Sequence, residues 1–422
     1  MSRVSILNFI AKIKISNMRQ ILNLITQRGG AQAIVFISTI FATKYFLPED
    51  FGLVGLFTSI CSFFALFTSL RFEIKALVSK QEYSHNKFIS LAYLSNFILF
   101  IFFTLISIIL YFFKFVKSWV LFIPFGVFFF CLTQYILPAQ NSRVQQLKKL
   151  GWMTQIIAII TALAQILGAL FFPSFWILII GRLIAWVAGV IFMFESVILG
   201  VKNAVKLSLN DIRRMYGCCH TEIFYEIPAA LVSVISFQIP AYIYYLYNLN
   251  AETGVYWLAF NLLFMPFIII STSIRPLFIR YLSSNKVENK PLFLKKFIIF
   301  SFLGGGAFVF VINFIMYLLC LYYLPEEWAS AQSYTLALSL MVITLFSQAG
   351  VSFGISIFDL QKINLVSQSL QVFSRILVMV YILSYIEDPL VAIWGYSIIS
   401  FIGYILYIYY CLNIVSKRSL VP

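Results

Sequence analysis

The sequence predicts an all-α integral membrane protein with about 12 transmembrane helices in two sets of six. Three observations lead to this fold class. The 422-residue chain is 62% hydrophobic and only 11% charged, whereas soluble domains carry roughly 25% charged residues. Apolar runs long enough to cross a bilayer follow one another along the chain. A partial repeat, spaced by close to half the chain, relates the two sets of spans.

The stretch from Tyr45 to Lys80 shows the pattern of a single span most clearly. A polar corner, Pro-Glu-Asp, leads into an uninterrupted apolar run over residues 51–70, and charged residues close the run from Arg71 onward. An α-helix needs about 20 apolar residues to cross ~30 Å of hydrocarbon. A buried helix of a soluble protein rarely runs so far without a charge. We therefore interpret this stretch as a membrane span.

A weaker copy of the same stretch occurs in the second half of the chain. The residues of the corner recur 202 positions later, and the Ser-aliphatic-Arg sequence at the end of the span recurs 204 positions later. The matched pairs are Tyr45 and Tyr247, Leu47 and Leu249, Asp50 and Glu252, Gly52 and Gly254, Ser69 and Ser273, Leu70 and Ile274, and Arg71 and Arg275. An internal duplication gives such a spacing. Chance matching between two apolar runs is the alternative.

Taken in order, the chain divides into five segments. Residues 1–21 are basic and mildly amphipathic, which favours an interfacial cytoplasmic helix over a cleaved signal peptide. We expect a six-helix bundle at residues 22–200, a cytoplasmic linker at 201–223, a second six-helix bundle at 224–415 and a cytoplasmic tail at 416–422. The predicted spans are residues 22–46, 51–70, 88–113, 119–140, 151–172, 174–197, 224–247, 253–281, 297–323, 329–358, 363–385 and 389–415.

Lysine and arginine residues are concentrated in alternate loops, and this asymmetry predicts the orientation. The basic loops cover residues 71–87, 143–149, 202–214, 280–296 and Lys362, and both termini lie on their side. The opposite loops hold only three lysines and instead carry seven acidic residues: Lys44, Lys114, Lys117, Glu49, Asp50, Glu252, Glu326, Glu327, Glu387 and Asp388. The positive-inside rule therefore predicts that both termini are cytoplasmic.

Several kinds of soluble chemistry are excluded by the motifs. The net charge of +15 does not indicate nucleic-acid binding, because the basic residues lie in loops that face anionic lipid and no zinc-finger or RNA-binding signature accompanies them. The six cysteines and two histidines lack metal-ligand spacing. Gly304-Gly305-Gly306 has no following lysine, so it predicts close helix packing or a flexible point and not a phosphate loop. We expect no catalytic residue, no metal and no cofactor.

Cations within membrane depth are the most informative residues. Arg182 lies mid-span, about 12 Å from either water phase at 1.5 Å per residue, and Arg375 lies well inside its own span. Arg28 and Arg275 lie near the inner ends of theirs. An arginine at the bilayer centre costs at least ~2.5–3.5 kcal/mol, so Arg182 and Arg375 are expected to face a cavity or a partner. Snorkelling to cytoplasmic headgroups is the alternative for Arg28 and Arg71.

Among the acidic residues, Glu226 is the candidate for ion coupling. Its neighbours Phe224, Tyr225 and Ile227 are apolar and favour its neutral form, and Glu222 one turn earlier adds like-charge repulsion. Such a carboxylate could take up a proton or a sodium ion. The alternative is that both acids begin the helix on the cytoplasmic side and complement its dipole.

One local motif resembles a known family. Residues 44–52, KYFLPEDFG, followed by Leu70-Arg71-Phe72-Glu73, resemble the N-terminal signature of Wzx-type O-antigen and polysaccharide flippases, a branch of the superfamily shared with lipid II flippases and MATE exporters. The resemblance implies a V-shaped cavity between two bundles and alternating access driven by an ion gradient. It also implies movement of undecaprenyl-diphosphate-linked oligosaccharide to the periplasmic leaflet of the bacterial inner membrane. Lys44 and Arg71 stand where the family commonly has a basic residue.

The implied substrate agrees with the cations, since guanidinium binds phosphate oxygens in a planar fork. The expected cavity cations are Arg28, Lys44, Arg71, Arg182, Arg275 and Arg375. Implied partners are membrane lipid, a polysaccharide polymerase and a chain-length regulator. The rival function is a membrane-embedded polymerase or lipid-dependent glycosyltransferase, which needs a sizeable outer loop, and the outer corners here are short. Cation export of the MATE kind is the other rival, and intramembrane arginines argue against it.

Overall fold

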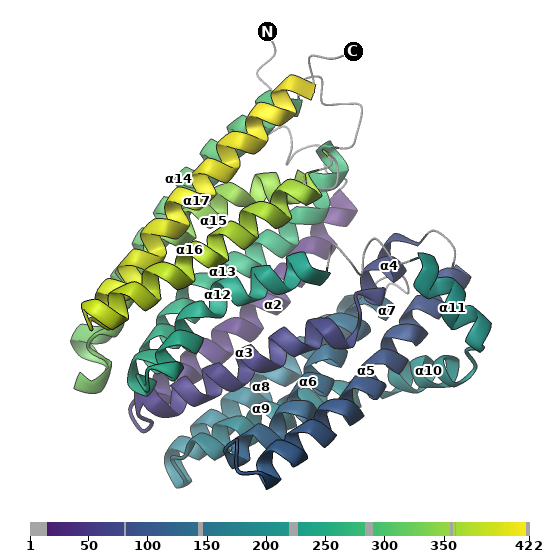
Figure 1. Ribbon diagram of the computed structural model, residues 1–422, viewed down its shortest axis with the longest axis horizontal. Coiled ribbons are helices and arrows are strands. Elements are labelled where there is room, and N and C mark those ends of the chain that lie inside the picture. Colours follow the sequence, from purple (N-terminus) through teal and green to yellow (C-terminus); the bar gives the residue numbers. More distant parts are fainter. Residues whose placement is uncertain are drawn as a thin grey trace. The chain divides into compact units, whose positions relative to one another are not determined.

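The computed structural model describes residues 15–79, 82–141, 147–218, 227–282, 290–354, 358 and 360–418 (Figure 1). Within these ranges all regular secondary structure is helical. The chain forms two compact units, which are described separately: the 33–242 unit, and the 243–422 unit, which also includes residues 1–32. The all-α fold class is confirmed. The residue limits that we expected for the two bundles stay a prediction.

The helices follow the predicted spans closely. Ten helical segments of the described residues are long and apolar enough to cross a membrane, and Ala230–Leu246 is a shorter apolar helix. The chain is therefore a multi-pass membrane protein, and the expected number of 12 spans is approximate. The helix α2 (Ile15–Ala42) corresponds to the first predicted span and passes from one unit into the other.

The 33–242 unit contains most of the first-half helices. After α2 they are α3 (Pro48–Thr68), α4 (Phe72–Val78), α5 (Glu82–Phe112), the 3-10 turn η1 (Ser118–Phe122), α6 (Ile123–Cys131), the π-helical turn η2 (Leu132–Ile136), α7 (Leu137–Asn141), α8 (Leu147–Phe171), α9 (Phe175–Phe192), α10 (Phe194–Val205) and α11 (Leu209–Cys218), together with the part of α12 (Ile227–Leu246) that ends at Tyr242. In this unit α3 is central, packing against α5, α6 and α9.

Small residues allow the helices of the 33–242 unit to approach closely. A Cβ on Gly126 of α6 would lie 2.4 Å from Sγ of Cys61 on α3. A Cβ on Gly181 of α9 would lie 2.3 Å from that of Ala164 on α8. Close approach of this kind replaces the hydrophobic driving force that helices lack inside a bilayer. Trp186 of α9 then fills the space beside α3.

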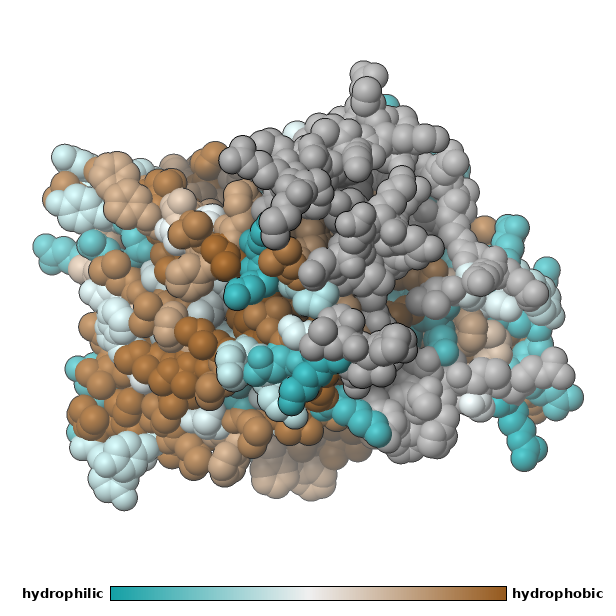
Figure 2. Space-filling model, turned by 90° about the horizontal axis from the view of Figure 1, so that it is seen from above, coloured by the Kyte–Doolittle hydropathy of each residue, from teal (hydrophilic) through white to brown (hydrophobic). Residues whose placement is uncertain are grey.

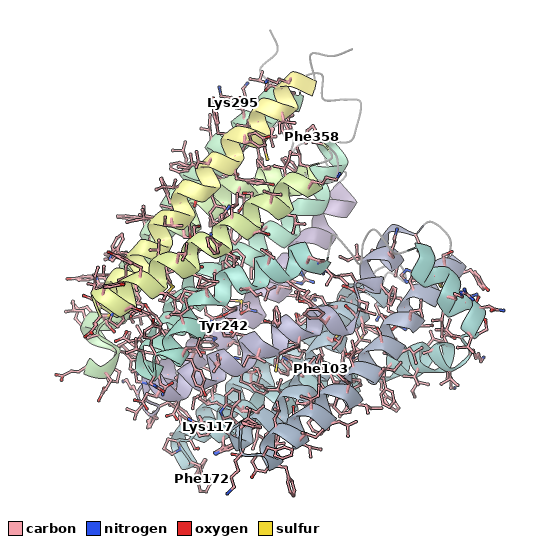
Figure 3. The ribbon with its side chains drawn as sticks, in the orientation of Figure 1. Phe103, Lys117, Phe172, Tyr242, Lys295 and Phe358 are labelled. Atoms are coloured by element: carbon pink, nitrogen blue, oxygen red, sulfur yellow. The ribbon has the colours of Figure 1, made fainter. Side chains whose placement is uncertain are left out.

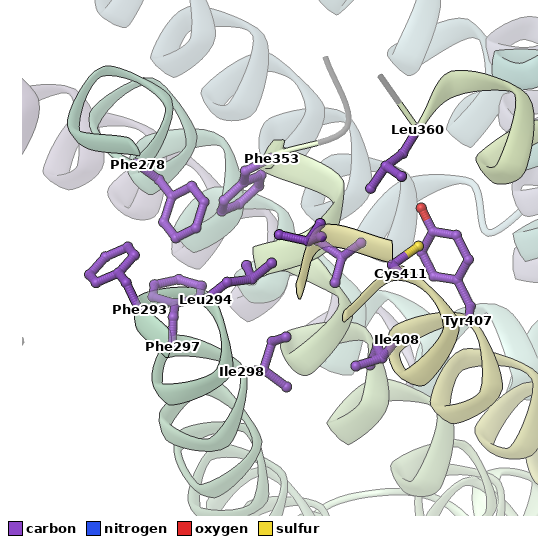
Figure 4. Close-up of a cluster of buried hydrophobic side chains, with 12 residues drawn as sticks. Phe278, Phe293, Leu294, Phe297, Ile298, Phe353, Leu360, Tyr407, Ile408 and Cys411 are labelled. Carbon is purple, nitrogen blue, oxygen red and sulfur yellow. The ribbon is translucent and has the colours of Figure 1, made fainter. Parts of the chain in front are cut away.

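The 243–422 unit is built from the long second-half helices. They are α13 (Asn250–Leu282), α14 (Lys290–Tyr322), the 3-10 turn η4 (Glu326–Trp328), α15 (Ala331–Gly354), α16 (Gln361–Tyr385) and α17 (Pro389–Arg418). In this unit α15 packs against α13, α14 and α17. Figure 4 shows one buried cluster, in which three phenylalanine rings around Phe278 meet side chains of α15 and α17.

The outer faces of the helices carry apolar side chains. On α5, Ile98, Phe102, Leu105 and Ile109 follow the helical repeat and are all about half exposed or more. Apolar residues also cover broad areas of the surface in Figure 2, where hydrophilic residues form small groups. A soluble monomer rarely exposes so much apolar surface. This surface is what a lipid-facing protein requires.

The ends of the helices alternate as the spans predict. In the 33–242 unit, Lys117 and Phe172 lie at the same end of the helices, and Phe103 lies between the ends (Figure 3). In the 243–422 unit, Lys295 and Phe358 likewise lie at one end. Loops that the sequence assigns to the same membrane face therefore meet at the same end of their unit.

The two copies of the predicted repeat differ in backbone conformation. In the first copy the helix stops at Thr68 and a new helix begins at Phe72. In the second copy α13 continues through Ser273, Ile274 and Arg275 without a break. The break between Thr68 and Phe72 is therefore a feature of the first copy, and the matching residues of the second copy lie within a continuous helix.

Candidate anion-binding site

The break between α3 and α4 is the most unusual local structure in the described chain. Leu70 and Arg71 have φ angles of 47° and 59°, so two consecutive non-glycine residues adopt the left-handed region. Each costs about 1–2 kcal/mol relative to a right-handed residue. The N–H of Phe72 donates to the Ser69 carbonyl (3.0 Å), which closes the turn. Strain of this kind persists only where the surrounding contacts hold it in place.

The short helix α4 provides those contacts. Phe72 and Ala76 are buried, and α4 packs against α5 and α7. The His85 ring on α5 donates from Nδ1 to the Ala76 carbonyl (2.8 Å), which fixes the tautomer because a carbonyl only accepts. These contacts hold the chain directly after Arg71 against the rest of the 33–242 unit.

Arg71 forms an ion pair across this turn. Its Nη1 lies 3.6 Å from Oε1 of Glu73, and the Arg71 side chain is 18% exposed while that of Glu73 is 4% exposed. Burial raises the pKa of the Glu73 carboxyl, and the Arg71 charge acts in the opposite direction. The Arg71 guanidinium is therefore partly accessible, whereas the Glu73 carboxylate is buried.

A π-helical turn lies against this ion pair. Tyr135, in the π-helical turn, lies close enough to Arg71 and Glu73 to interact electrostatically with both. Cys131, the residue directly before that turn, interacts in the same way with Glu73. Turns of this type inside α-helices are frequent at functional sites. The arrangement brings together Arg71 from the turn before α4, Glu73 from α4 itself and Tyr135 from η2.

Arg182 lies in the middle of α9, as the sequence predicts. Its side chain is neither fully buried nor fully exposed. One turn further on, Trp186 stacks on Phe57 of α3 with ring centroids 6.4 Å apart and meets Phe130 edge-on at 5.3 Å. The backbone at Arg182 is thus held rigidly by packing against α3 and α6. A cation on a rigid helix at this depth suits the recognition of an anion.

Lys44 lies at the other end of α3 from Arg71. It is exposed in the turn between α2 and α3. The length of α3 separates the two cations by about 30 Å. The corner beside Lys44 has a structural role, because the Asp50 carboxylate faces the backbone N–H groups of Leu47 and of Phe175 at the start of α9. Cations of the 33–242 unit therefore lie at three depths rather than in one cluster.

Arg375 occupies a closed environment inside the 243–422 unit. Its side chain is 0% exposed, and Nη2 donates to Oε1 of Gln371 one turn earlier (3.0 Å). The guanidinium carbon lies 5.3 Å from the ring centroid of Tyr396 and 5.1 Å from that of Tyr404, both on α17. We expected this residue to face a cavity or a partner, and its neighbours are aromatic partners within the unit.

The structure describes the remaining predicted residues only in part. The backbone of Arg275 belongs to α13, about 28 Å along that helix from Tyr256, which neighbours Arg375. The Arg275 side chain lies outside the described part of the structure. Arg28 is half-buried on α2. Glu226 falls in residues 219–226, which the structure does not describe, so its proposed role stays a prediction.

Comparison with known proteins identifies a family to which this chain is similar in sequence. A family model described as "Polysaccharide biosynthesis protein" matches residues 45–331, more than half of the chain. The chain belongs to this family. The matched region of this polysaccharide biosynthesis protein begins at the corner motif and includes the break at Arg71. The resemblance stated from the sequence is confirmed. No curated protein sequence matches the chain significantly.

Solved structures agree on the fold of this polysaccharide biosynthesis protein. It is similar to the lipid II flippase MurJ in an inward closed conformation, with a TM-score of 0.68 and 12% identity over 95% of this chain and 91% of that one. An inward-facing multidrug resistance MATE transporter of the MOP superfamily gives 0.55 and 11% over 94% and 96%. The Vibrio cholerae MATE transporter VcmN in its bent form gives 0.55 and 11% over 95% and 99%.

Several polar contacts escape the sequence reasoning. The sequence analysis named Glu73 only as part of the Leu70-Arg71-Phe72-Glu73 motif and did not predict its ion pair with Arg71. The signal for this pair is an acidic residue two positions after an arginine at the membrane edge. The Ser38 hydroxyl of α2 donates to Gln165 of α8 (2.5 Å), and the Ser59 hydroxyl of α3 donates to Gln238 of α12 (2.6 Å). Glutamines inside apolar spans are the signal that indicates such interhelical bonds.

Proposed function

We propose that this polysaccharide biosynthesis protein is a flippase for undecaprenyl-diphosphate-linked oligosaccharide, such as an O-antigen, capsule or exopolysaccharide repeat unit. It moves this substrate from the cytoplasmic to the periplasmic leaflet of the bacterial inner membrane by alternating access between two helical bundles. Both termini are cytoplasmic. A polysaccharide polymerase and a chain-length regulator act on the product.

The observation that carries the proposal is the partly exposed Arg182 at the middle of a membrane-crossing helix, in a fold shared with a lipid II flippase. A cation at this depth costs free energy unless it performs a function. Lys44 and Arg71, at the two ends of α3, extend positive charge along the 33–242 unit. Cations at successive depths of the membrane can bind an anion at each stage of its passage from one side to the other.

The physical problem that such a protein solves is the transfer of a diphosphate and sugar hydroxyls through hydrocarbon. Without water or a substitute for it, these groups lose their hydration at a prohibitive cost. A guanidinium restores two hydrogen bonds at once, because its planar fork matches phosphate oxygens. Arginine at the centre of the path is therefore better suited than lysine to this substrate.

Complementation of a flippase-deficient strain tests the proposal. Arg182→Ala abolishes complementation at normal protein levels, and Arg182→Lys retains part of the activity, because it keeps the charge but loses the fork. Lys149→Ala is the control, since this exposed lysine pairs with Glu195 at the surface (3.3 Å) and such pairs contribute little. Full activity of Arg182→Ala would remove this residue from the mechanism.

Ion coupling is the finer part of the proposal. Uptake of a proton or sodium ion from the periplasm by Glu226 resets the cavity toward the cytoplasm. Proteoliposome transport under an imposed gradient checks this step, with Glu226→Gln expected to lose stimulation by the gradient. Equal stimulation of both proteins would leave Glu226 as a helix-end residue.

A further inference from the structure

The ion pair at the α3–α4 break has a geometry that a purely structural pair does not need. The two charged residues are separated by one residue, and the first of them is held in a left-handed conformation. The 3.6 Å separation is longer than the ~2.7–2.9 Å of a charge-assisted hydrogen bond. Arg71 thus remains partly accessible, and its partner holds it loosely.

Arg71 supplies the positive charge that acts on the Glu73 carboxyl. The groups that face it are Ser69 and Arg71 on its own side and Cys131 and Tyr135 from the α6–η2 segment. From α5, His85 contacts α4 through the Ala76 carbonyl and not through Glu73. The described part of α12 adds apolar Ile227 and Leu231, which pack beside Leu70 and Tyr135 in one cluster.

We propose that Glu73 is a built-in competitor for Arg71: an anionic diphosphate ester binds Arg71 by displacing the Glu73 carboxylate, and protonation of Glu73 favours that exchange. Glu73 is a positioning residue that controls how available the cation is. This inference deepens the proposed function and rests on it, because the ligand class is the diphosphate ester of a flippase substrate.

The electrostatics of the turn give the direction of the effect. Burial raises the pKa of the Glu73 carboxyl above its value in the unfolded chain. Ionised Glu73 therefore costs stability at neutral pH, and this cost disappears as the pH falls through the folded-state pKa toward that of the unfolded chain. When an anion binds Arg71, Glu73 loses the counter-charge that Arg71 supplies and is driven further toward the protonated form. By linkage, lower pH strengthens anion binding.

The exchange of partners at Arg71 lets the protein bind a headgroup from the cytoplasmic leaflet without changing its fold. Arg71 is itself the second residue of the strained turn, and its side chain changes partner while α4 stays docked on α5 and α7. No movement of a whole helix is needed for the first capture of the headgroup. Release from Arg71 is assisted by the return of the carboxylate.

The test uses the full-length protein in nanodiscs of zwitterionic lipid. The probe is a prenyl-diphospho-N-acetylglucosamine, a diphosphate diester whose own charge does not titrate over the range used. Affinity is measured at a series of pH values from about pH 8 down to about pH 5, because burial raises the pKa of the Glu73 carboxyl above its ordinary value. The wild type is expected to bind more tightly as the pH falls. Glu73→Gln is expected to bind about 3- to 10-fold more tightly than wild type at the higher pH and to lose the pH dependence.

Matched variants separate the possible outcomes. Glu82→Gln removes an exposed acid at the start of α5 and is expected to behave as wild type. Arg71→Ala is expected to lose binding at every pH, and unfolding temperatures confirm that each variant is folded. In nanodiscs that contain phosphatidylglycerol, unchanged probe affinity assigns the site to the diphosphate, whereas competition assigns it to any anionic headgroup and overturns the ligand class.

Two failures are distinguishable. If Arg71→Ala loses binding but Glu73→Gln keeps the affinity and the pH profile of the wild type, Glu73 is not a competitor and the inference is wrong while the proposed function stands. If neither the wild type nor Glu73→Gln binds the probe, both the inference and the proposed function are wrong.

Discussion

Two arginines that look alike in the sequence have different environments in the structure. Arg182 and Arg375 both interrupt apolar spans, and membrane depth is all that the sequence reveals about them. Arg375 is sealed between Gln371 and the rings of Tyr396 and Tyr404, whereas Arg182 keeps part of its surface exposed. Partners on a neighbouring helix cannot be assigned from one sequence. Depth was therefore predictable and accessibility was not.

Arg375 is expected to act on stability. Arg375→Ala removes the charged hydrogen bond to Gln371 and the cation–π contacts with Tyr396 and Tyr404, which together contribute about 2–4 kcal/mol in a buried site. Its unfolding temperature in detergent should fall and protein levels should drop, with Arg375→Lys intermediate because lysine keeps the charge. Loss of complementation at a wild-type unfolding temperature would contradict this and return Arg375 to the substrate path.

At the scale of elements, the break between α3 and α4 marks the limit of sequence reasoning. The apolar run of residues 51–70 predicted where α3 ends, since the charged residues follow directly. Nothing in the local composition predicted left-handed Leu70 and Arg71, because both are residues that normally avoid this region. The conformation is imposed by the docking of α4, a tertiary effect. The matching Ser-aliphatic-Arg sequence in α13 stays helical.

The three consecutive glycines of α14 offer a test of helix packing. A Cβ on Gly305 would lie 2.9 Å from Cβ of Phe346 on α15, whereas a Cβ on Gly304 meets nothing within 4 Å. Gly305→Ala should lower the unfolding temperature, because overpacking typically costs about 1–3 kcal/mol. Gly304→Ala is the matched control and should keep or raise it, since alanine is favoured in a helix by about 1 kcal/mol. The reverse order would show that α14 and α15 do not pack this way.

At the scale of the whole molecule, the hydrophobic pattern predicted most of the fold. The apolar runs located nearly every helix, because each span must satisfy its own backbone inside the bilayer. The predicted span at 174–197 is the clearest difference: α9 ends at Phe192, and α10 begins at Phe194 after a change of backbone direction at Met193. Because apolar residues continue from the end of α9 into the start of α10, the sequence pattern joins the two helices into one predicted span.

Orientation in the membrane is testable at four exposed positions. Glu326 and Glu387 lie in loops that we assign to the periplasm, and Lys148 and Lys202 lie in segments that we assign to the cytoplasm. In intact cells, an impermeant thiol reagent should label Glu326→Cys and Glu387→Cys and leave Lys148→Cys and Lys202→Cys unlabelled. All four side chains are exposed, so a difference in labelling reports the membrane side. Labelling of either lysine position from outside would overturn the orientation.

Reconstituted translocation tests the central claim most directly. Purified protein in proteoliposomes is given a fluorescent undecaprenyl-diphosphate-linked oligosaccharide in one leaflet, and its arrival in the other leaflet is followed with an impermeant quencher. We predict translocation by the wild type, its loss in Arg182→Ala, and recovery of the oligosaccharide with its glycosidic linkages unchanged. A lengthened or transferred oligosaccharide would identify a polymerase or transferase instead. Equal movement in wild-type and protein-free vesicles would contradict the flippase account.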